Sequence, residues 1–303
     1  MKFDALDIFL EHRRQQQSWH HNKVSGTDPM DSLVTVEMNI TELCNRKCVF
    51  CPRADETVFP NRKLNMDVAV SAKVASDLAS IGYQGRISFT GWGESLLNKK
   101  FADHIQVFRA HLPENTIETN TNGDKLNPER IRTLYASGLT YLYVNMYDGP
   151  EQMQKFSDMF QEAGIRKERF RLRCRWSGPD DKFGITMNNR GGILNRPELG
   201  HTPLRDPLRQ KCYYPFFKMF VDFDGTVFFC SNDWGRTTPI GNVMQASVRD
   251  LWLSPKLKQI RERLSGSDRS VHPCSACDVN GMLHGKHSFD ILTKYYGIAP
   301  VED

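Results

Sequence analysis

The stretch CNRKCVFC, residues 44–51, follows a short apolar run at residues 34–40 and decides how the chain is interpreted. Its cysteines, Cys44, Cys48 and Cys51, stand in the spacing CxxxCxxC directly after what we expect to be the first strand. Three thiolates can hold three irons of a 4Fe-4S cube and leave the fourth iron without a protein ligand. Such an open metal position is what a cluster that binds a co-substrate requires.

A structural zinc site is the alternative for these three cysteines. Zinc needs a fourth ligand nearby, and Asp55 or Glu56 could supply it. Carboxylates are uncommon in structural zinc sites, so the spacing favours the iron-sulfur cluster.

Short strand-like runs alternate with amphipathic helical stretches from residue 33 onward, which is typical of βαβ units. We expect strands at residues 34–40, 86–90, 116–120, 141–146 and 170–176, and a sixth around residues 185–187. We expect helices at residues 66–80, with Asn65 as N-cap, and at 100–110, 128–137 and 150–163. This pattern predicts an α/β fold, a partial (β/α)6 barrel of the TIM type, with its active site at the carboxyl ends of the strands.

The pattern changes after about Arg196, where prolines cluster and the alternation stops. Two apolar runs, residues 216–222 and 226–230, flank an Asp-Gly turn and predict a β-hairpin. Residues 248–264 predict a helix. We therefore expect three parts: an N-terminal extension at residues 1–32, the barrel at residues 33–196, and a small domain of hairpin plus helix at residues 197–303.

Composition limits the function classes. The 303 residues are 39% hydrophobic, enough to bury a sizeable core, and carry a mild net charge of +4 without a basic and aromatic cluster. No apolar run approaches the roughly 20 residues of a membrane span, and residues 1–31 do not resemble a secretory signal. We expect a cytoplasmic protein that acts on small molecules, with neither nucleic acid nor a membrane as partner.

Four further cysteines stand in the C-terminal part, the last two as CxxC: Cys212, Cys230, Cys274 and Cys277. A chain without an export signal is kept reduced, so metal sites are favoured over disulfides. Four thiolates fully ligate one metal site, and their spacing alone allows either zinc or a second iron-sulfur cluster.

The first cysteine motif, with Phe50 before its third cysteine, resembles the signature of the radical S-adenosylmethionine (SAM) superfamily. The resemblance implies that the amino and carboxylate groups of SAM chelate the open iron. It also implies that an electron from the cluster splits SAM into methionine and a 5′-deoxyadenosyl radical, which abstracts a hydrogen atom from the substrate. An electron donor such as flavodoxin or ferredoxin is then required.

Polar motifs follow the next three expected strands. After the second strand, TGWGE at residues 90–94 is similar to the family's glycine-rich motif, which implies that Glu94 receives the SAM amino group. Gly91 and Gly93 would let the backbone approach SAM, although Trp92 departs from the commonest residue of the motif. A turn with a solvated glutamate is the alternative.

The third and fourth strands are followed by NTNG at residues 120–123 and NMYDG at residues 145–149, which resemble the family's polar strand tips. The resemblance makes Asn120, Asn122 and Asn145 candidates for contacts to the ribose and carboxylate of SAM. Each motif alone is an ordinary turn. Their ordered recurrence at successive strands is what supports the assignment.

The C-terminal cysteines, together with the first motif, look like the SPASM and Twitch domains of radical SAM enzymes. The resemblance implies a second 4Fe-4S cluster and, by size and cysteine layout, oxidation of a secondary alcohol of a sugar or aminocyclitol. The second cluster would then take the electron that the substrate radical must lose. Modification of a ribosomal peptide is the enzymatic alternative, and a zinc-stapled binding module is the alternative without catalysis.

Three residues or groups stand outside these motifs. Arg190, within NNRGG at residues 188–192, is similar to an Asn-Arg-small-Gly stretch in these relatives and is a candidate for substrate contact or proton handling. Arg171, Arg173 and Arg175 share one face of the fifth strand; if that face points into the barrel, Arg173 meets SAM or a substrate anion. If it points outward, Cys174 faces the substrate, where its thiol could donate a hydrogen atom in an epimerisation.

Overall fold

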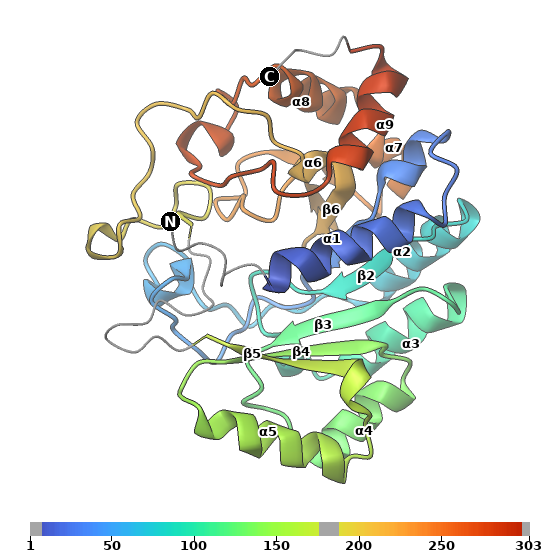
Figure 1. The fold of residues 1–303 in the computed structure, drawn as a ribbon, viewed down its shortest axis with the longest axis vertical. Coiled ribbons are helices and arrows are strands. Elements are labelled where there is room, and N and C mark those ends of the chain that lie inside the picture. Colours follow the sequence, from blue (N-terminus) through green and yellow to red (C-terminus); the bar gives the residue numbers. More distant parts are fainter. Residues whose placement is uncertain (1–7, 176–187, 299–303) are drawn as a thin grey trace.

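The computed structural model describes residues 8–175 and 188–298 (Figure 1). Its core is one eight-stranded sheet in the order β5-β4-β3-β2-β1-β6-β7-β8. The strands are β1 (Thr35–Met38), β2 (Arg86–Phe89), β3 (Ile117–Thr121), β4 (Tyr141–Met146), β5 (Phe170–Cys174), β6 (Lys218–Val221), β7 (Thr226–Phe228) and β8 (Pro239–Asn242). Strands β1 to β5 confirm the five expected strands, and the expected sixth strand around residues 185–187 lies outside the described residues.

The parallel part of the sheet contains β1 to β6. Strand β6 pairs in parallel with β1, in the register Thr35↔Lys218, and β7 and β8 continue the sheet in antiparallel order. The first expected hairpin strand begins later than residue 216 because α6 (Tyr214–Phe217) forms a short helical turn there. The hairpin therefore belongs to the same sheet as the barrel strands, since β6 takes a place beside β1.

Helices cover one face of the parallel strands. They are α2 (Val68–Ser80), α3 (Phe101–His111), α4 (Pro128–Ala136) and α5 (Glu151–Glu162), with α7 (Val248–Trp252), α8 (Pro255–Ser265) and α9 (Lys286–Tyr296) in the C-terminal part. Phe89 of β2 packs edge-on against Phe101 and Phe108 of α3, with ring centroids 5.2 and 5.7 Å apart. Asp67, not the expected Asn65, caps α2, because its carboxylate accepts a hydrogen bond from the Ala69 amide.

The expected helix at residues 248–264 is two helices. Leu253 ends α7, and the Ser254 hydroxyl accepts from the Leu257 amide 3.3 Å away and caps α8, which begins at Pro255. A proline at the first helical position is tolerated because its missing N–H has no partner within the helix. The sequence pattern did not predict α9 or β8.

The opposite face of the sheet carries α1 (Ile8–His21), which runs alongside β2 in Figure 1. The Gln16 amide donates to the Tyr143 hydroxyl at 2.9 Å and approaches the Glu118 carboxylate at 3.4 Å. Glu118 and Tyr143 alternate with the apolar residues that face the helices, so the inner face of the partial barrel is polar and partly filled by α1. No helix within the described ranges is long and apolar enough to cross a membrane.

Candidate active site

The first cysteine loop lies at the carboxyl end of β1 and is held by its neighbours. The Cys44 amide donates to the Asn61 side chain at 2.9 Å, and the Asn61 side chain returns a 3.0 Å hydrogen bond to the Cys44 carbonyl. Cys48 and Cys51 are joined by a backbone hydrogen bond of 2.9 Å. These hydrogen bonds fix the backbone of the loop at Cys44 and at Cys51.

The three thiols are half-buried and share one electrostatic environment. Burial, followed by the charges of Cys51 and Cys44, raises the pKa of Cys48 to about 12. Burial also raises the pKa of Cys44 and of Cys51. Thiolates this close together are stable only beside a cation, and the irons of a cluster supply one. The donor set therefore fits an iron-sulfur cluster.

Glu94 is buried, with 4% of its surface exposed, so the alternative of a solvated glutamate is wrong. One carboxylate oxygen accepts from the Thr121 hydroxyl at 2.8 Å and the Leu96 amide at 3.1 Å, and the other accepts from the Asn122 amide at 2.8 Å. The carboxylate thus ties the tip of β2 to the tip of β3. Burial raises its pKa, and these hydrogen bonds oppose that effect.

Gly91 and Gly93 let two segments of the protein approach each other. A Cβ at Gly93 would lie 2.0 Å from the Thr41 carbonyl oxygen, and one at Gly91 would lie 2.5 Å from the Asn39 side-chain oxygen. That oxygen accepts from the amides of Trp92 and Gly93. The glycines thus allow the tip of β2 to pack closely against the segment that leads to Cys44. Asn39, which the sequence motifs did not single out, organises this contact.

The asparagines at the next two strand tips also lie at this edge. The Asn122 amide donates to the Asn45 side chain in the cysteine loop at 3.0 Å. Asn120 accepts from the Arg173 guanidinium at 2.6 Å, and Asn145 accepts from the Arg175 guanidinium at 3.2 Å. Of the three, Asn122 contacts the first cysteine loop directly, and Asn120 and Asn145 lie at the neighbouring strand ends, so their contacts to SAM stay a prediction.

A clamp that the sequence motifs did not reveal holds the same loop. Arg46, between the first two cysteines, donates to the carboxylates of Asp124 and Asp148 over distances of 2.5 to 2.7 Å. These aspartates follow the tips of β3 and β4. The Arg46 guanidinium also lies 5.3 Å from the centre of the Tyr147 ring. That ring stacks on the Phe50 ring, with ring centroids 5.7 Å apart.

The register of β5 decides between the two predicted orientations. Phe170 stacks on Phe160 of α5 with ring centroids 3.9 Å apart, and Cys174 lies on the same face of the strand, against the apolar core. Arg173 is on the opposite face, 3.8 Å from the centre of the Tyr143 ring. The arginines therefore point into the barrel, and Cys174 lies on the helix side because successive residues of a strand alternate between faces. This position does not support the predicted role of Cys174 as a hydrogen donor to substrate.

The four C-terminal cysteines are buried together, although they come from three separate segments. Burial, followed by the neighbouring cysteines, raises the pKa of Cys274, and burial raises the pKa of Cys230 to about 12. Four buried thiols whose charges raise one another's pKa need cations beside them once they are deprotonated, so this donor set fits a metal site with four cysteine ligands.

Arg190 lies between the two groups of cysteines. Asn189, beside it, donates its amide to the Asp278 carboxylate at 2.9 Å and its side chain to the Ala276 carbonyl at 2.7 Å, which fixes the loop on the last cysteine pair. The Arg190 guanidinium reaches the Phe50 carbonyl in the first cysteine loop at 3.4 Å. Burial lowers its pKa, whereas the charge of Cys51 and then that of Tyr147 oppose this effect.

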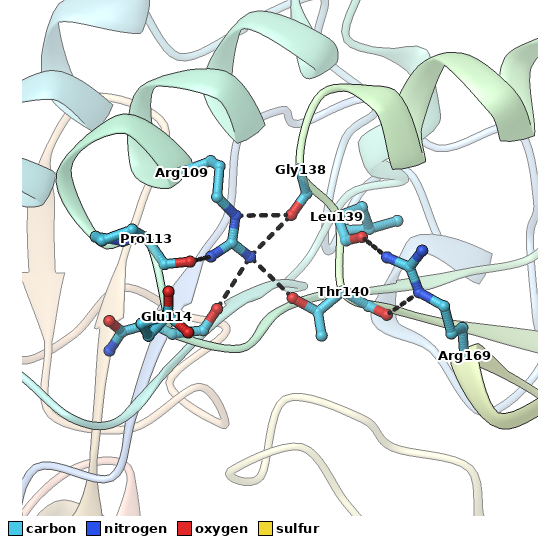
Figure 2. Close-up of a pocket in the computed structure, with 8 residues that line it drawn as sticks. Arg109, Pro113, Glu114, Gly138, Leu139, Thr140 and Arg169 are labelled. Atoms are coloured by element: carbon cyan, nitrogen blue, oxygen red, sulfur yellow. Dashed lines mark hydrogen bonds between the residues drawn. The ribbon is translucent and has the colours of Figure 1, made fainter.

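A surface hollow of the protein lies away from both groups of cysteines. It encloses about 320 Å³ near the amino ends of β3 and β4, the edge opposite the cysteines. Figure 2 shows that Arg109 uses its guanidinium to join surrounding loops, with hydrogen bonds to Gly138, Thr140 and nearby carbonyls. Its donors are satisfied by the protein, so the hollow is a structural junction and not the active site.

Comparisons with known proteins agree with the two cysteine sites. The family model of the radical SAM superfamily matches residues 38–171, and that of the SPASM iron-sulfur cluster-binding domain matches residues 212–278. A curated relative, the S-adenosyl-L-methionine-dependent 2-deoxy-scyllo-inosamine dehydrogenase of Niallia circulans, is 28% identical over 268 residues. The match covers 88% of this chain and 99% of the relative.

Solved structures show the same architecture. BtrN in complex with AdoMet and 2-DOIA has a TM-score of 0.67 at 25% identity, over 84% of this chain and 96% of BtrN. A structure of anSMEcpe with bound AdoMet has a TM-score of 0.54 at 13% identity, over 88% of this chain and 96% of anSMEcpe, and shows likeness of fold alone.

These matches fix the cofactor class and remove one alternative. SAM and iron-sulfur clusters are the cofactors that the two matched domains imply. The zinc-stapled binding module without catalysis is therefore wrong. Residues 38–171 therefore form a radical SAM domain and residues 212–278 a SPASM iron-sulfur cluster-binding domain, and the chain is a radical SAM enzyme.

Proposed function

We propose that this enzyme oxidises a secondary alcohol of a sugar or aminocyclitol to a ketone. The support is the match over nearly the full length of a 2-deoxy-scyllo-inosamine dehydrogenase and the likeness to BtrN in its complex with 2-DOIA. Peptide modification gains less support, because the structures of anSMEcpe with bound peptides are 14% identical to this chain. Epimerisation through Cys174 gains less support, because that thiol packs against the apolar core on the helix side of β5.

The two groups of cysteines have different roles in this proposal. Cys44, Cys48 and Cys51 hold the cluster that binds SAM, and the four buried C-terminal cysteines hold a second, fully ligated cluster. Together these cofactors supply a 5′-deoxyadenosyl radical for hydrogen abstraction and an acceptor for one electron. Glu94 and the asparagines at the strand tips shape the SAM site, and Arg173 supplies a positive charge on the inner face of the barrel.

A single observation carries the assignment of Arg190. Its loop is fixed to the last cysteine pair, while its guanidinium reaches the carbonyl beside Cys51. A group in that position contacts a substrate held between the two sites. Oxidation of an alcohol releases a proton from the hydroxyl as well as a hydrogen atom from carbon. We infer that Arg190 orients the hydroxyl and takes part in moving that proton.

The decisive experiment combines metal analysis with product analysis. Anaerobically purified protein should contain about seven or eight irons with matching sulfide, and Cys274→Ala should lose about four of them. With reductant, SAM and a panel of aminocyclitols and sugars, one substrate should yield a ketone and 5′-deoxyadenosine in equal amounts. Formation of 5′-deoxyadenosine without any ketone across the panel, but with a modified peptide, would overturn the proposal.

The role of Arg190 needs its own variant. Arg190→Met should keep both clusters and uncoupled SAM cleavage but lose most ketone formation, and Arg190→Lys should show a shifted pH profile. Arg171→Met, on the inner face of β5 but farther from the cysteines, is the matched control. Equal ketone formation by Arg190→Met and the wild type would remove Arg190 from the site.

We also propose where the enzyme works and what reduces it. Its eight free thiols and its oxygen-sensitive clusters suit the reducing cytoplasm. A flavodoxin or ferredoxin would deliver the electron to the first cluster, whose cysteines are half-buried, whereas the C-terminal cysteines are buried.

A further inference from the structure

Arg53 is a buried cation directly after the first cysteine loop. It stands in the 3-10 turn η3 (Pro52–Ala54), two residues after Cys51, and only 3% of its surface is exposed. One guanidinium nitrogen donates to the Trp92 carbonyl, and a second donates to the Asn61 side chain at 3.2 Å. The third nitrogen, Nη2, is buried and has no hydrogen-bond partner among the described residues.

The two satisfied nitrogens aim the side chain at the first cysteine site. The Asn61 side chain hydrogen-bonds both the amide and the carbonyl of Cys44. Trp92 lies between the two glycines at which the tip of β2 approaches the chain before Cys44. The Phe59 ring lies 4.8 Å from the guanidinium carbon and covers one face of it. The side chain is therefore enclosed by the segments that position Cys44 and Cys51.

The charge of Arg53 is not neutralised by a neighbouring carboxylate. Within the described ranges it forms no salt bridge, whereas nearby Arg236 is paired with both Glu42 and Asp222. A buried, unpaired cation with an unpartnered N–H donor is strongly destabilising unless an anion occupies the adjacent space.

We propose that Arg53 is a positioning residue for the cluster held by Cys44, Cys48 and Cys51, and that its Nη2 donates to a sulfur of that cluster. The inference rests on the proposed assignment of these three cysteines. The charge of Arg53 then favours the reduced cluster. Reduction transfers one electron from the donor, a flavodoxin or ferredoxin, to the cluster and makes the cluster more negative by one charge.

The direction of the effect follows from electrostatics. A fixed cation in a low-dielectric site stabilises the more negative redox state more than the less negative one. Hydrogen bonds to the sulfurs of a cluster raise its reduction potential in the same direction. Arg53 therefore makes the cluster easier to reduce and slows the loss of its irons.

The test compares Arg53→Met with Arg53→Lys in the anaerobic, cluster-loaded enzyme. The signal of the first cluster is identified by electron paramagnetic resonance as the one that changes on addition of SAM. Arg53→Met should shift its reduction potential to more negative values and release iron to a chelator several-fold faster. Arg53→Lys should restore part of the potential, because it keeps the charge while losing the guanidinium geometry.

Arg261→Met is the matched control. Arg261 is also a fully buried guanidinium with an idle Nη2, but it donates to the carbonyls of Pro215 and Trp252, remote from the first cysteine loop. Its substitution should lower the melting temperature equally in apo and loaded protein and leave the potential unchanged. Arg53→Met should instead lower the melting temperature only slightly in the apo protein and more strongly in the cluster-loaded protein.

The outcomes separate this inference from the proposed function. If the wild type shows no SAM-sensitive cluster signal, the assignment of the three cysteines fails. If it shows the signal and Arg53→Met has the same potential as the wild type, the cysteine assignment stands and the inference about Arg53 is overturned. An equal shift of potential in Arg261→Met would also overturn it.

Discussion

Two hydrogen bonds join the guanidinium of Arg46 to the carboxylate of Asp124, from Nε to Oδ2 at 2.7 Å and from Nη2 to Oδ1 at 2.5 Å. This bidentate pair connects the cysteine loop to the tip of β3, and Asp148 completes the clamp from the tip of β4. Charge-assisted bidentate pairs fix geometry as well as adding energy. The loop that holds the first cluster is therefore tied to the strand tips that shape the SAM site.

Asp124→Asn should loosen this clamp without removing a cysteine. The amide keeps the shape of the side chain but loses the charge and one hydrogen-bond acceptor. This loss should lower the free energy of unfolding by about 1–3 kcal/mol. We expect faster loss of iron from the first cluster and a lower melting temperature. Asp158→Asn, an exposed carboxylate on α5, is the control. Equal iron retention in both variants would show that the clamp does not support the cluster.

Gly93→Ala tests the close approach of two backbone segments. Because the added Cβ would lie 2.0 Å from the Thr41 carbonyl oxygen, the tip of β2 must move, at a cost of about 3 kcal/mol or more. We expect strong destabilisation and poor cluster incorporation. Gly266→Ala, at φ −84° with 3.5 Å to the nearest atom, should instead be neutral or stabilise by up to about 1 kcal/mol. Similar melting temperatures for the two variants would contradict a steric clash between a Cβ at Gly93 and the Thr41 carbonyl oxygen.

Cys174→Ala should leave catalysis intact, since the thiol packs on the helix side of β5. We expect normal 5′-deoxyadenosine and ketone formation, a change in stability within about 1 kcal/mol, and no solvent deuterium in recovered substrate. Cys51→Ala is the control and should abolish SAM cleavage. A variant of Cys174 that cleaves SAM but has lost product formation would place this thiol at the substrate after all.

His104 makes folding stability depend on pH. It is buried, with its ring against the Ser71 hydroxyl at 2.8 Å, and burial lowers its pKa from 6.5 to about 4. Between these values the unfolded chain binds a proton that the folded chain excludes. The stabilising contribution is therefore complete above pH 6.5 and decreases as the pH falls toward 4, by up to about 3 kcal/mol.

Chemical unfolding of the wild type and of His104→Gln at several pH values tests this pH dependence of folding stability. The free energy of unfolding of the wild type should decrease more steeply than that of His104→Gln between pH 6.5 and pH 4. His111→Gln, at the exposed end of the same helix, should follow the wild type. Parallel pH profiles of the wild type and His104→Gln would mean that the buried ring does not control this dependence.

The sequence determined the five barrel strands, the helices between them and the cysteine spacing, because each depends on local periodicity or on neighbours in the chain. It also placed the polar tips correctly, since the carboxyl ends of parallel strands meet at one edge of the sheet. It failed at Asn65, where Asp67 is the cap, and at β8, where Pro239 and Gly241 obscure the strand pattern.

The tertiary structure alone decided which face of β5 points inward and that β6 pairs with β1. A period of two residues shows that Arg173 and Cys174 lie on opposite faces, but the choice of face depends on the packing of α5. The contacts of Arg46 with Asp124 and Asp148, of Arg53 with Trp92, and of Asn189 with Asp278 were likewise hidden, because each joins segments far apart in the chain. Such contacts are set by the way the sheet assembles, and no local pattern in the sequence encodes them.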